Sequence, residues 1–123
     1  MGLAAALDAQ ARKAVVPTTV VADGVGRFSQ DIEATVYFSC LEALQNVAKY
    51  AEATAATVTL RSDDGHLEFT VSDDGRGFDP KATGYGTGLH GIVDRVAASG
   101  GTVEVRSAPG AGTSLAGRIP TDG

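Results

Sequence analysis

The stretch Val71-Ser72-Asp73-Asp74-Gly75-Arg76-Gly77-Phe78 carries two carboxylates and two closely spaced glycines directly after an apolar run. Glycine reaches backbone conformations closed to other residues and leaves bare backbone that a ligand can approach. A carboxylate at Asp73, fixed at a strand end beside that backbone, suits the amino edge of a flat heterocycle such as an aminopurine. Because Asp-Gly is also common turn chemistry, an ordinary surface turn is the alternative for this stretch alone.

A second group of chemically capable side chains has helical spacing. Glu42, Asn46 and Lys49 stand at i, i+4 and i+7, with Tyr50 at the margin, and therefore share one helix face. The group combines a base, a metal-ligating oxygen, a phosphate-pairing cation and an aromatic stacking surface. A polar helix face is usually only solvated, so this mixture is what favours a functional role.

The segment Gly86-Thr87-Gly88-Leu89-His90-Gly91 matches G-x-G-x-x-G literally, but it is not a dinucleotide fingerprint. Such a fingerprint directly follows a strand in a parallel βαβ unit, and here an irregular segment precedes it. No P-loop sequence occurs in the chain. Free N–H groups at a helix N-terminus still bind anions, so we expect phosphates near Gly86, Thr87, Gly88 and Leu89. A connector without a ligand is the alternative.

Periodicity and turn signals predict the elements that position these residues. Helical spacing indicates helices from Leu3 to about Val15, from a Ser29 N-cap to about Ala51, and from Leu89 to the stop at Ser99-Gly100-Gly101. Alternation indicates an edge strand at 18–21 and two hairpins, 57–60 with 67–71 and 102–106 with 114–119. The segment from Asp79 to Thr87 has no periodicity and is expected to form a short lid.

The long helix must turn one face toward a core. That face carries Val36, Cys40, Leu44, Val47 and Ala51, with Cys40 as a buried thiol. Helices packed on one face of a mixed, mostly antiparallel sheet make an α+β two-layer sandwich. No linker or repeat divides the chain, so we expect residues 1–123 to form one domain whose motifs lie within residues 29–120.

Composition argues against several classes of function. Lys plus Arg total 10 against 15 Asp plus Glu, a net charge of -5, so nucleic acid is not an expected partner. The single cysteine rules out an internal disulfide, and His66 and His90 lack a second ligand at metal spacing. No apolar run reaches the roughly 20 residues of a membrane span, and no signal peptide is visible. We therefore expect a cytoplasmic domain without membrane contact.

Taken together, three ordered motifs resemble the N, G1 and G2 boxes of the GHKL ATPases. They are Glu42-x-x-x-Asn46-x-x-Lys49-Tyr50-Ala51, Asp73-x-Gly75-x-Gly77 and Gly84-x-Gly86-x-Gly88-Leu89. Within that superfamily the chain looks like the ATP-binding catalytic domain of a NarL-like bacterial sensor histidine kinase. This closer similarity is carried by Gly88-Leu89-His90-Gly91-Ile92-Val93-Asp94-Arg95-Val96, by Gly100-Gly101 and by Ser107-Ala108-Pro109-Gly110-Ala111-Gly112-Thr113.

The resemblance implies a Bergerat-type fold with ATP lying between the long helix and the lid. Asp73 looks like the carboxylate that receives the adenine amino group, in a turn that includes Gly75, and Gly77 would line the base. Thr113 would act through a water near the adenine. Tyr50 would flank the purine or the ribose.

The resemblance also implies which groups hold the phosphates. Asn46 looks like the Mg²⁺ ligand, since its amide oxygen is a hard donor, and Lys49 would pair with a phosphate. Glu42 looks like the general base or the group that orients the accepting histidine. The glycine-rich segment would complete the cofactor site with Gly84, Gly86, Thr87, Gly88 and Leu89.

The implied reaction is transfer of the ATP γ-phosphoryl to a histidine imidazole, with a response regulator downstream. In the family that histidine lies on a separate dimerisation helix, so we expect no autophosphorylation by this chain alone. One alternative is an anti-sigma-factor-like serine kinase of the same fold, which the NarL-like run disfavours. Another is a nucleotide-binding module without catalysis.

Overall fold

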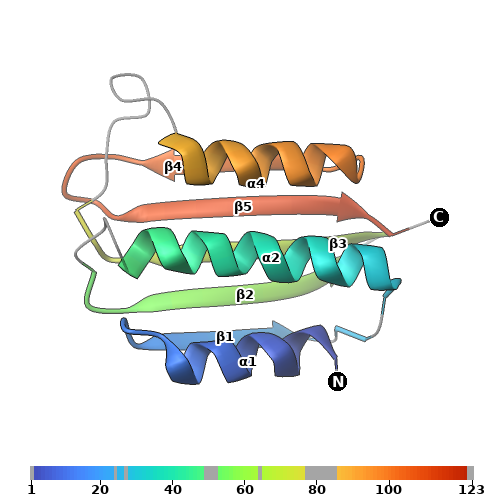
Figure 1. Ribbon diagram of the computed structural model, residues 1–123, viewed down its shortest axis with the longest axis horizontal. Helices are drawn as coiled ribbons and strands as arrows, with labels where there is room; N and C mark the ends of the chain where they lie inside the picture. Colours follow the sequence, from blue (N-terminus) through green and yellow to red (C-terminus); the bar gives the residue numbers. More distant parts are fainter. Residues whose placement is uncertain are drawn as a thin grey trace.

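Helices cover one face of a mixed β-sheet in the computed structural model, which describes residues 2–23, 25–26, 28–48, 53–63, 65–76 and 86–121 (Figure 1). Within these residues the elements follow the order α1, β1, α2, β2, β3, α4, β4, β5. Their bounds are Leu3–Lys13, Thr18–Asp23, Gln30–Asn46, Ala56–Asp63, His66–Asp73, Gly86–Ala98, Thr102–Ser107 and Thr113–Pro120. The expected α+β two-layer sandwich is confirmed.

The sheet has the strand order β1-β2-β3-β5-β4, which places β1 at an edge as predicted. β1 pairs in parallel with β2, whereas the other neighbours pair antiparallel. The parallel pair follows from the crossover through α2, since parallel neighbours need a long connection. Both predicted hairpins form, and their turns place Gly65 and Gly110 at positive φ, 79° and 81°.

The core lies between the helices and the sheet. In β3 the residues Leu67, Phe69 and Val71 are buried and alternate with partly exposed ones, as expected for a strand with one covered face. The predicted apolar face of α2 is buried at Val36, Cys40, Leu44 and Val47. Burial raises the pKa of the Cys40 thiol to about 12, so this residue is an inert part of the core, as predicted.

Predicted signals mark the ends of both long helices. The Ser29 side chain accepts a hydrogen bond from the Ile32 N–H at 3.3 Å, which confirms it as the N-cap of α2. At the end of α4, Gly100 has φ of 80°, and the Gly101 N–H donates to the Val96 carbonyl at 3.0 Å. This left-handed glycine stop ends the helix where the sequence predicted.

The start of α4 and the end of α2 differ from the predicted boundaries. Gly86 and Thr87 belong to the first turn of α4, so the predicted loop extends too far, because a helix's first residues need no helical periodicity to be included. The helix predicted to reach Ala51 is α2, which ends at Asn46 and continues through residues 47 and 48 as a wider turn. Residues 49–52 and 77–85, including most of the predicted lid, lie outside the described residues.

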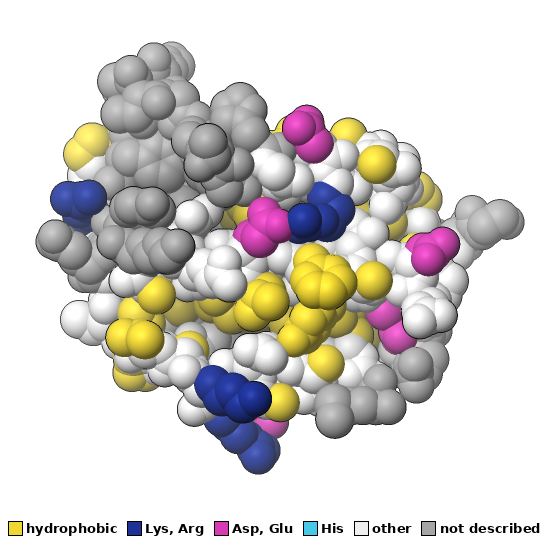
Figure 2. All heavy atoms as spheres, in the orientation of Figure 1, with side chains coloured by type: hydrophobic (Ala, Val, Ile, Leu, Met, Phe, Trp, Pro, Cys, Tyr) yellow, Lys and Arg dark blue, Asp and Glu magenta, His cyan; other side chains and the backbone are white. Residues whose placement is uncertain are grey.

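Hydrophobic side chains also gather over the middle of the helix-bearing face (Figure 2). Phe38 of α2 is 50% exposed, and its ring meets Tyr37 edge to face with the centroids 5.2 Å apart. Phe38 stands one helical turn before Glu42. The α2 surface that leads to Glu42 is therefore partly apolar.

Substitution of Gly117 in β5, even by alanine, is predicted to destabilise the fold. An added Cβ would lie 2.2 Å from Cζ of Phe69, whose ring is fully buried and cannot move aside. Gly117→Ala should lower the free energy of unfolding by about 1–3 kcal/mol, measured by urea denaturation. The control is Gly26→Ala, where no described atom lies within 4 Å, and it should change little. Equal effects of the two substitutions would contradict this packing.

Candidate nucleotide-binding site

The carboxylate of Asp73 is positioned at the end of a central strand. Asp73 is the last residue of β3, and its Oδ1 accepts a hydrogen bond of 2.7 Å from the N–H of the buried Gly75. This bond to the backbone two residues on is an Asx turn. None of the described residues donates a hydrogen bond to Oδ2. One oxygen is therefore fixed, and the other can accept from a ligand.

The neighbouring carboxylate, Asp74, has a structural role that the sequence did not reveal. It accepts hydrogen bonds from the Thr54 hydroxyl and from the N–H groups of Thr54 and Ala55, the latter two at 2.8 and 3.0 Å. The bonds from the Thr54 hydroxyl and the Ala55 and Thr54 amides hold the pKa of Asp74 below its ordinary value. Asp74 thus ties the end of β3 to the segment that leads into β2.

The other side of Asp73 is enclosed by the turn before β5. Thr113 pairs with Asp73 across the sheet, and its hydroxyl lies 2.8 Å from that of Ser107. Gly112 has φ of 75°, and a Cβ there would lie 2.2 Å from the Asp73 carbonyl oxygen. The Gly110 N–H donates to the Arg76 carbonyl at 2.6 Å. Gly112 was missed as a site residue, although Gly-x-Gly in a turn signals such an approach.

Helices α2 and α4 run antiparallel and bring the polar residues of α2 against α4. The hydroxyls of Thr35 and Ser99 lie 3.1 Å apart, and two turns later Glu42 Oε1 lies 2.6 Å from Nη1 of Arg95. Continuing this register by one turn sets the half-buried Asn46 near Gly91, in the second turn of α4. Arg95 was not singled out from the sequence as a partner of Glu42, because spacing along one helix cannot reveal a residue on another.

The candidate residues therefore meet at one end of the molecule. Figure 1 shows the C-terminal ends of α2 and β3 beside the N-terminal ends of α4 and β5, at the left of the view. This end holds Asn46, Asp73 and Thr113 together with the α4 backbone from Gly86 to Leu89. The first N–H groups of a helix lack intrahelical partners and carry a partial positive charge, which suits an anion.

Other predicted residues cannot be placed in this way. Lys49, Tyr50, Gly77 and Gly84 lie outside the described residues, as do the side chains of residues 86–90, so their roles stay predictions. His66 begins β3 at the opposite end from Asp73, and its Nδ1 lies 3.3 Å from Nη2 of Arg118. His66 therefore does not belong to this site.

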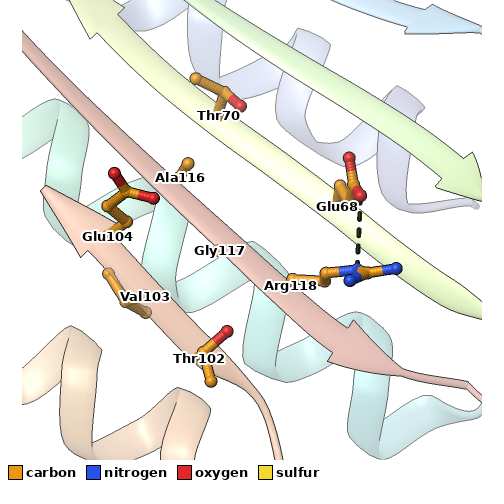
Figure 3. A pocket seen from close by; sticks show the side chains of 8 residues that line it. All are labelled: Glu68, Thr70, Thr102, Val103, Glu104, Ala116, Gly117 and Arg118. Carbon is orange, nitrogen blue, oxygen red and sulfur yellow. Dashed lines mark ion pairs between the residues drawn. The ribbon is translucent and has the colours of Figure 1, made fainter. Parts of the chain in front are cut away.

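A hollow on the far face of the sheet is distinct from this site. Figure 3 shows it on β3, β5 and β4, with the helices behind the strands, and Glu68 and Arg118 forming an ion pair of 3.4 Å. Its lining includes none of the predicted site residues. The convergence of strand and helix ends, rather than this hollow, therefore defines the candidate site.

A family comparison decides what this arrangement is. The family described as histidine kinase-, DNA gyrase B-, and HSP90-like ATPase matches residues 32–123. The chain belongs to this ATPase family. The matched range contains all of the motifs proposed above to bind nucleotide.

Two relatives with assigned functions are similar to this ATPase domain. The oxygen sensor histidine kinase NreB of Staphylococcus carnosus is 38% identical over 98 residues, which is 76% of this chain and 28% of NreB. The signal transduction histidine-protein kinase/phosphatase UhpB of Salmonella typhimurium is 34% identical over 87 residues, 71% of this chain and 17% of UhpB. The chain thus spans less than a third of either relative.

A solved structure gives the same fold. The blue-light activated histidine kinase of Erythrobacter litoralis EL346 superposes with a TM-score of 0.82 and 22% identity, over 98% of this chain and 42% of that chain. The expected resemblance to a GHKL domain of the sensor histidine kinase type is confirmed. These relatives give no support to the serine kinase alternative.

The net charge and the hydrophobicity of the helices bear on what the ATPase domain can bind. No helix within the described ranges is long and apolar enough to cross a membrane. The net charge of -5 leaves little electrostatic attraction for a nucleic acid backbone. A nucleotide must therefore be held by local features such as a helix N-terminus rather than by the overall field.

Asp74 is predicted to stabilise the ATPase domain in a pH-dependent way. Because the folded-state pKa lies below the unfolded one, the stabilisation is complete above about pH 4 and is lost as pH falls through the folded-state pKa. Asp74→Ala should therefore lower the thermal midpoint at pH 7, and the difference from the unaltered chain should shrink toward pH 3. Asp8→Ala, which breaks an exposed ion pair on α1, should have little effect at either pH. A constant Asp74→Ala deficit would contradict this prediction.

Proposed function

We propose that this domain binds Mg-ATP at the end where β3, α2 and α4 meet and transfers the γ-phosphoryl to a histidine on a separate dimerisation domain. The observation that carries the proposal is the convergence of Asp73, Asn46 and the N-terminus of α4. A carboxylate, an amide oxygen and a helix N-terminus match the three chemically different parts of Mg-ATP. They are an amino-purine, a hard cation and a polyphosphate.

Adenine recognition falls to Asp73. Its Oδ1 is engaged by Gly75, which leaves Oδ2 as the acceptor for the adenine amino group. Thr113 stands opposite Asp73 on β5, and it would act through a water near the adenine. Gly77 would line the purine and Tyr50 would flank it, as the family resemblance implies.

The helices would bind the phosphates and the cation. The α4 N–H groups at Gly86, Thr87, Gly88 and Leu89 face the polyphosphate, Gly84 precedes them, and Lys49 adds a positive charge. The described residues include no cluster of three His, Cys, Asp or Glu side chains, so they offer no dedicated metal cage. This fits Mg²⁺, which takes one or two protein ligands and completes its shell with phosphates and water, with Asn46 as the protein ligand.

The transfer step uses Glu42. An imidazole nitrogen of the acceptor histidine attacks the γ-phosphorus, and the bond from that phosphorus to the β,γ-bridging oxygen breaks to release ADP. The imidazole proton passes to the Glu42 carboxylate, or Glu42 orients the ring by accepting a hydrogen bond from the other nitrogen. Bound Mg²⁺ would neutralise charge that develops on the phosphates.

The products define the partners. Phosphohistidine is a high-energy phosphoryl donor, so a carboxylate on a response regulator is the expected recipient. The dimerisation helices of a full-length kinase would present the histidine to Glu42. Since the reaction consumes ATP, the domain would work in the cytoplasm.

A reconstituted transfer reaction tests this function. The chain is mixed with radiolabelled ATP, Mg²⁺ and a dimerisation fragment that bears the acceptor histidine, with a His→Gln fragment as the control. Label on the fragment that is stable in alkali and lost in acid identifies phosphohistidine and supports the proposal. Acid-stable label would support a serine kinase instead. ATP binding without any labelled protein would support a module without catalysis.

Asp73→Asn is predicted to weaken nucleotide binding strongly without unfolding the domain. Asparagine can keep the oxygen bonded to Gly75 and must then turn its NH₂ toward the adenine amino group, donor against donor. Loss of roughly 1.5–3 kcal/mol corresponds to an affinity about 10- to 100-fold weaker. Titration with a fluorescent ATP analogue measures it.

The matched control is Glu104→Gln. Glu104 is a carboxylate on β4 whose side chain is 63% exposed, and it lies on the hollow at the far face of the sheet. Its substitution should leave the affinity for the analogue unchanged. An Asp73→Asn variant that binds as well as this control would reject the adenine role of Asp73.

A further inference from the structure

Both oxygens of the Glu42 carboxylate face helix α4. Oε1 lies 2.6 Å from Nη1 of Arg95, and a Cβ added to Gly91 would lie 3.3 Å from Oε2. Gly91 precedes Arg95 by four residues, so the two stand on the same face of α4. One residue supplies a charge to the carboxylate, and the other leaves it the space to approach the helix.

The guanidinium of Arg95 is committed to this contact. Its Nη1 is buried and has no aligned hydrogen-bond acceptor, so the ion pair at 2.6 Å rests on proximity of charge rather than on a directed bond. The two side chains are only 35% and 30% exposed, which reduces screening by solvent. Among the described residues, Glu42 is the only carboxylate recorded in an ion pair with Arg95. Removing either partner would leave the other half-buried and uncompensated.

Helix α4 links this contact to the proposed phosphate site. The helix begins at Gly86, so Arg95 lies nine residues along it, a rise of roughly 14 Å. A second contact, between Thr35 and Ser99, fixes the register of α2 against α4 on the far side of Arg95. The carboxylate is therefore held at a defined height above the turn where the polyphosphate would bind.

We infer that Arg95 is a positioning residue that acts through Glu42, and that Gly91 gives the carboxylate its room. This role rests on the proposed function, because it concerns the group that would meet the acceptor histidine. The ion pair holds the Glu42 side chain in one orientation against α4. In this role Arg95 would touch neither ATP nor the acceptor.

The test compares Arg95→Gln and Arg95→Lys in the reconstituted transfer reaction, with the fragment that accepts phosphate from the unaltered chain. Misplacing a reacting group costs about 10- to 100-fold, so Arg95→Gln should lower kcat by that factor. The KM for ATP should change by less than about twofold, since no contact with nucleotide is lost. Arg95→Lys keeps the charge and should give an intermediate kcat.

A matched control and a second variant separate positioning from damage to the fold. Arg106→Gln breaks an exposed ion pair with Glu104, 2.7 Å long, on the other face of the sheet and should leave kcat unchanged. Gly91→Ala should lower kcat by crowding the carboxylate. Its thermal midpoint should not fall, because alanine favours the helix. A drop in midpoint without a drop in kcat would indicate a merely structural role.

Non-additivity gives the decisive result. If Arg95 acts only through Glu42, Arg95→Gln should cause no further loss of kcat in a Glu42→Gln background. An equal further loss there, or an unchanged kcat for Arg95→Gln alone, would overturn the positioning role and leave the proposed function intact. No transfer by the unaltered chain would reject the proposed function instead. The carboxyl ¹³C shift of Glu42, with and without Arg95→Gln, then still tests the contact.

Discussion

The candidate site depends on how the C-terminal end of β3 is held. Asp73 pairs with β2 on one side and with β5 on the other. The backbone of Asp73 is therefore held on both sides. Asp74 adds an anchor to Thr54 and Ala55, and Gly112 packs directly against the Asp73 carbonyl. With the backbone fixed on both sides, the Asp73 carboxylate is presented in one orientation. Recognition of a planar base needs such fixed geometry.

The two layers divide the chemistry between them. The sheet presents a carboxylate, which can read hydrogen-bond donors on a base, whereas the helix ends present opposite partial charges. The C-terminal end of α2 is negative and lies beside the positive N-terminal end of α4. The negative end of α2 would attract a cation near Asn46, and the positive end of α4 would attract an anion near Gly86. The antiparallel packing of α2 and α4, fixed by the contacts at Thr35 and Glu42, is what brings these ends together.

Local sequence signals predicted most of the fold. Alternation in 67–71, the Ser29 cap and the Gly100 stop each depend on interactions within a few residues, so each could be recognised from the chain alone. Boundaries were harder to predict. The sequence pattern places Gly86 and Thr87 in a loop, although they belong to α4, because the first turn of a helix makes no bonds that such a pattern reveals. The likeness to the ATPase family then connected the motifs that local signals could only suggest.

By itself the sequence determined which residues can do chemistry and the order in which they occur, since the motifs and their spacing are properties of the chain. Tertiary structure decided which of them meet and how each is held. That Asp73 and Asp74 differ in role follows from donors on another segment, Thr54 and Ala55, and that Glu42 faces Arg95 follows from helix packing. These contacts join residues 19 or more positions apart, and such pairs depend on how the layers assemble rather than on any local pattern.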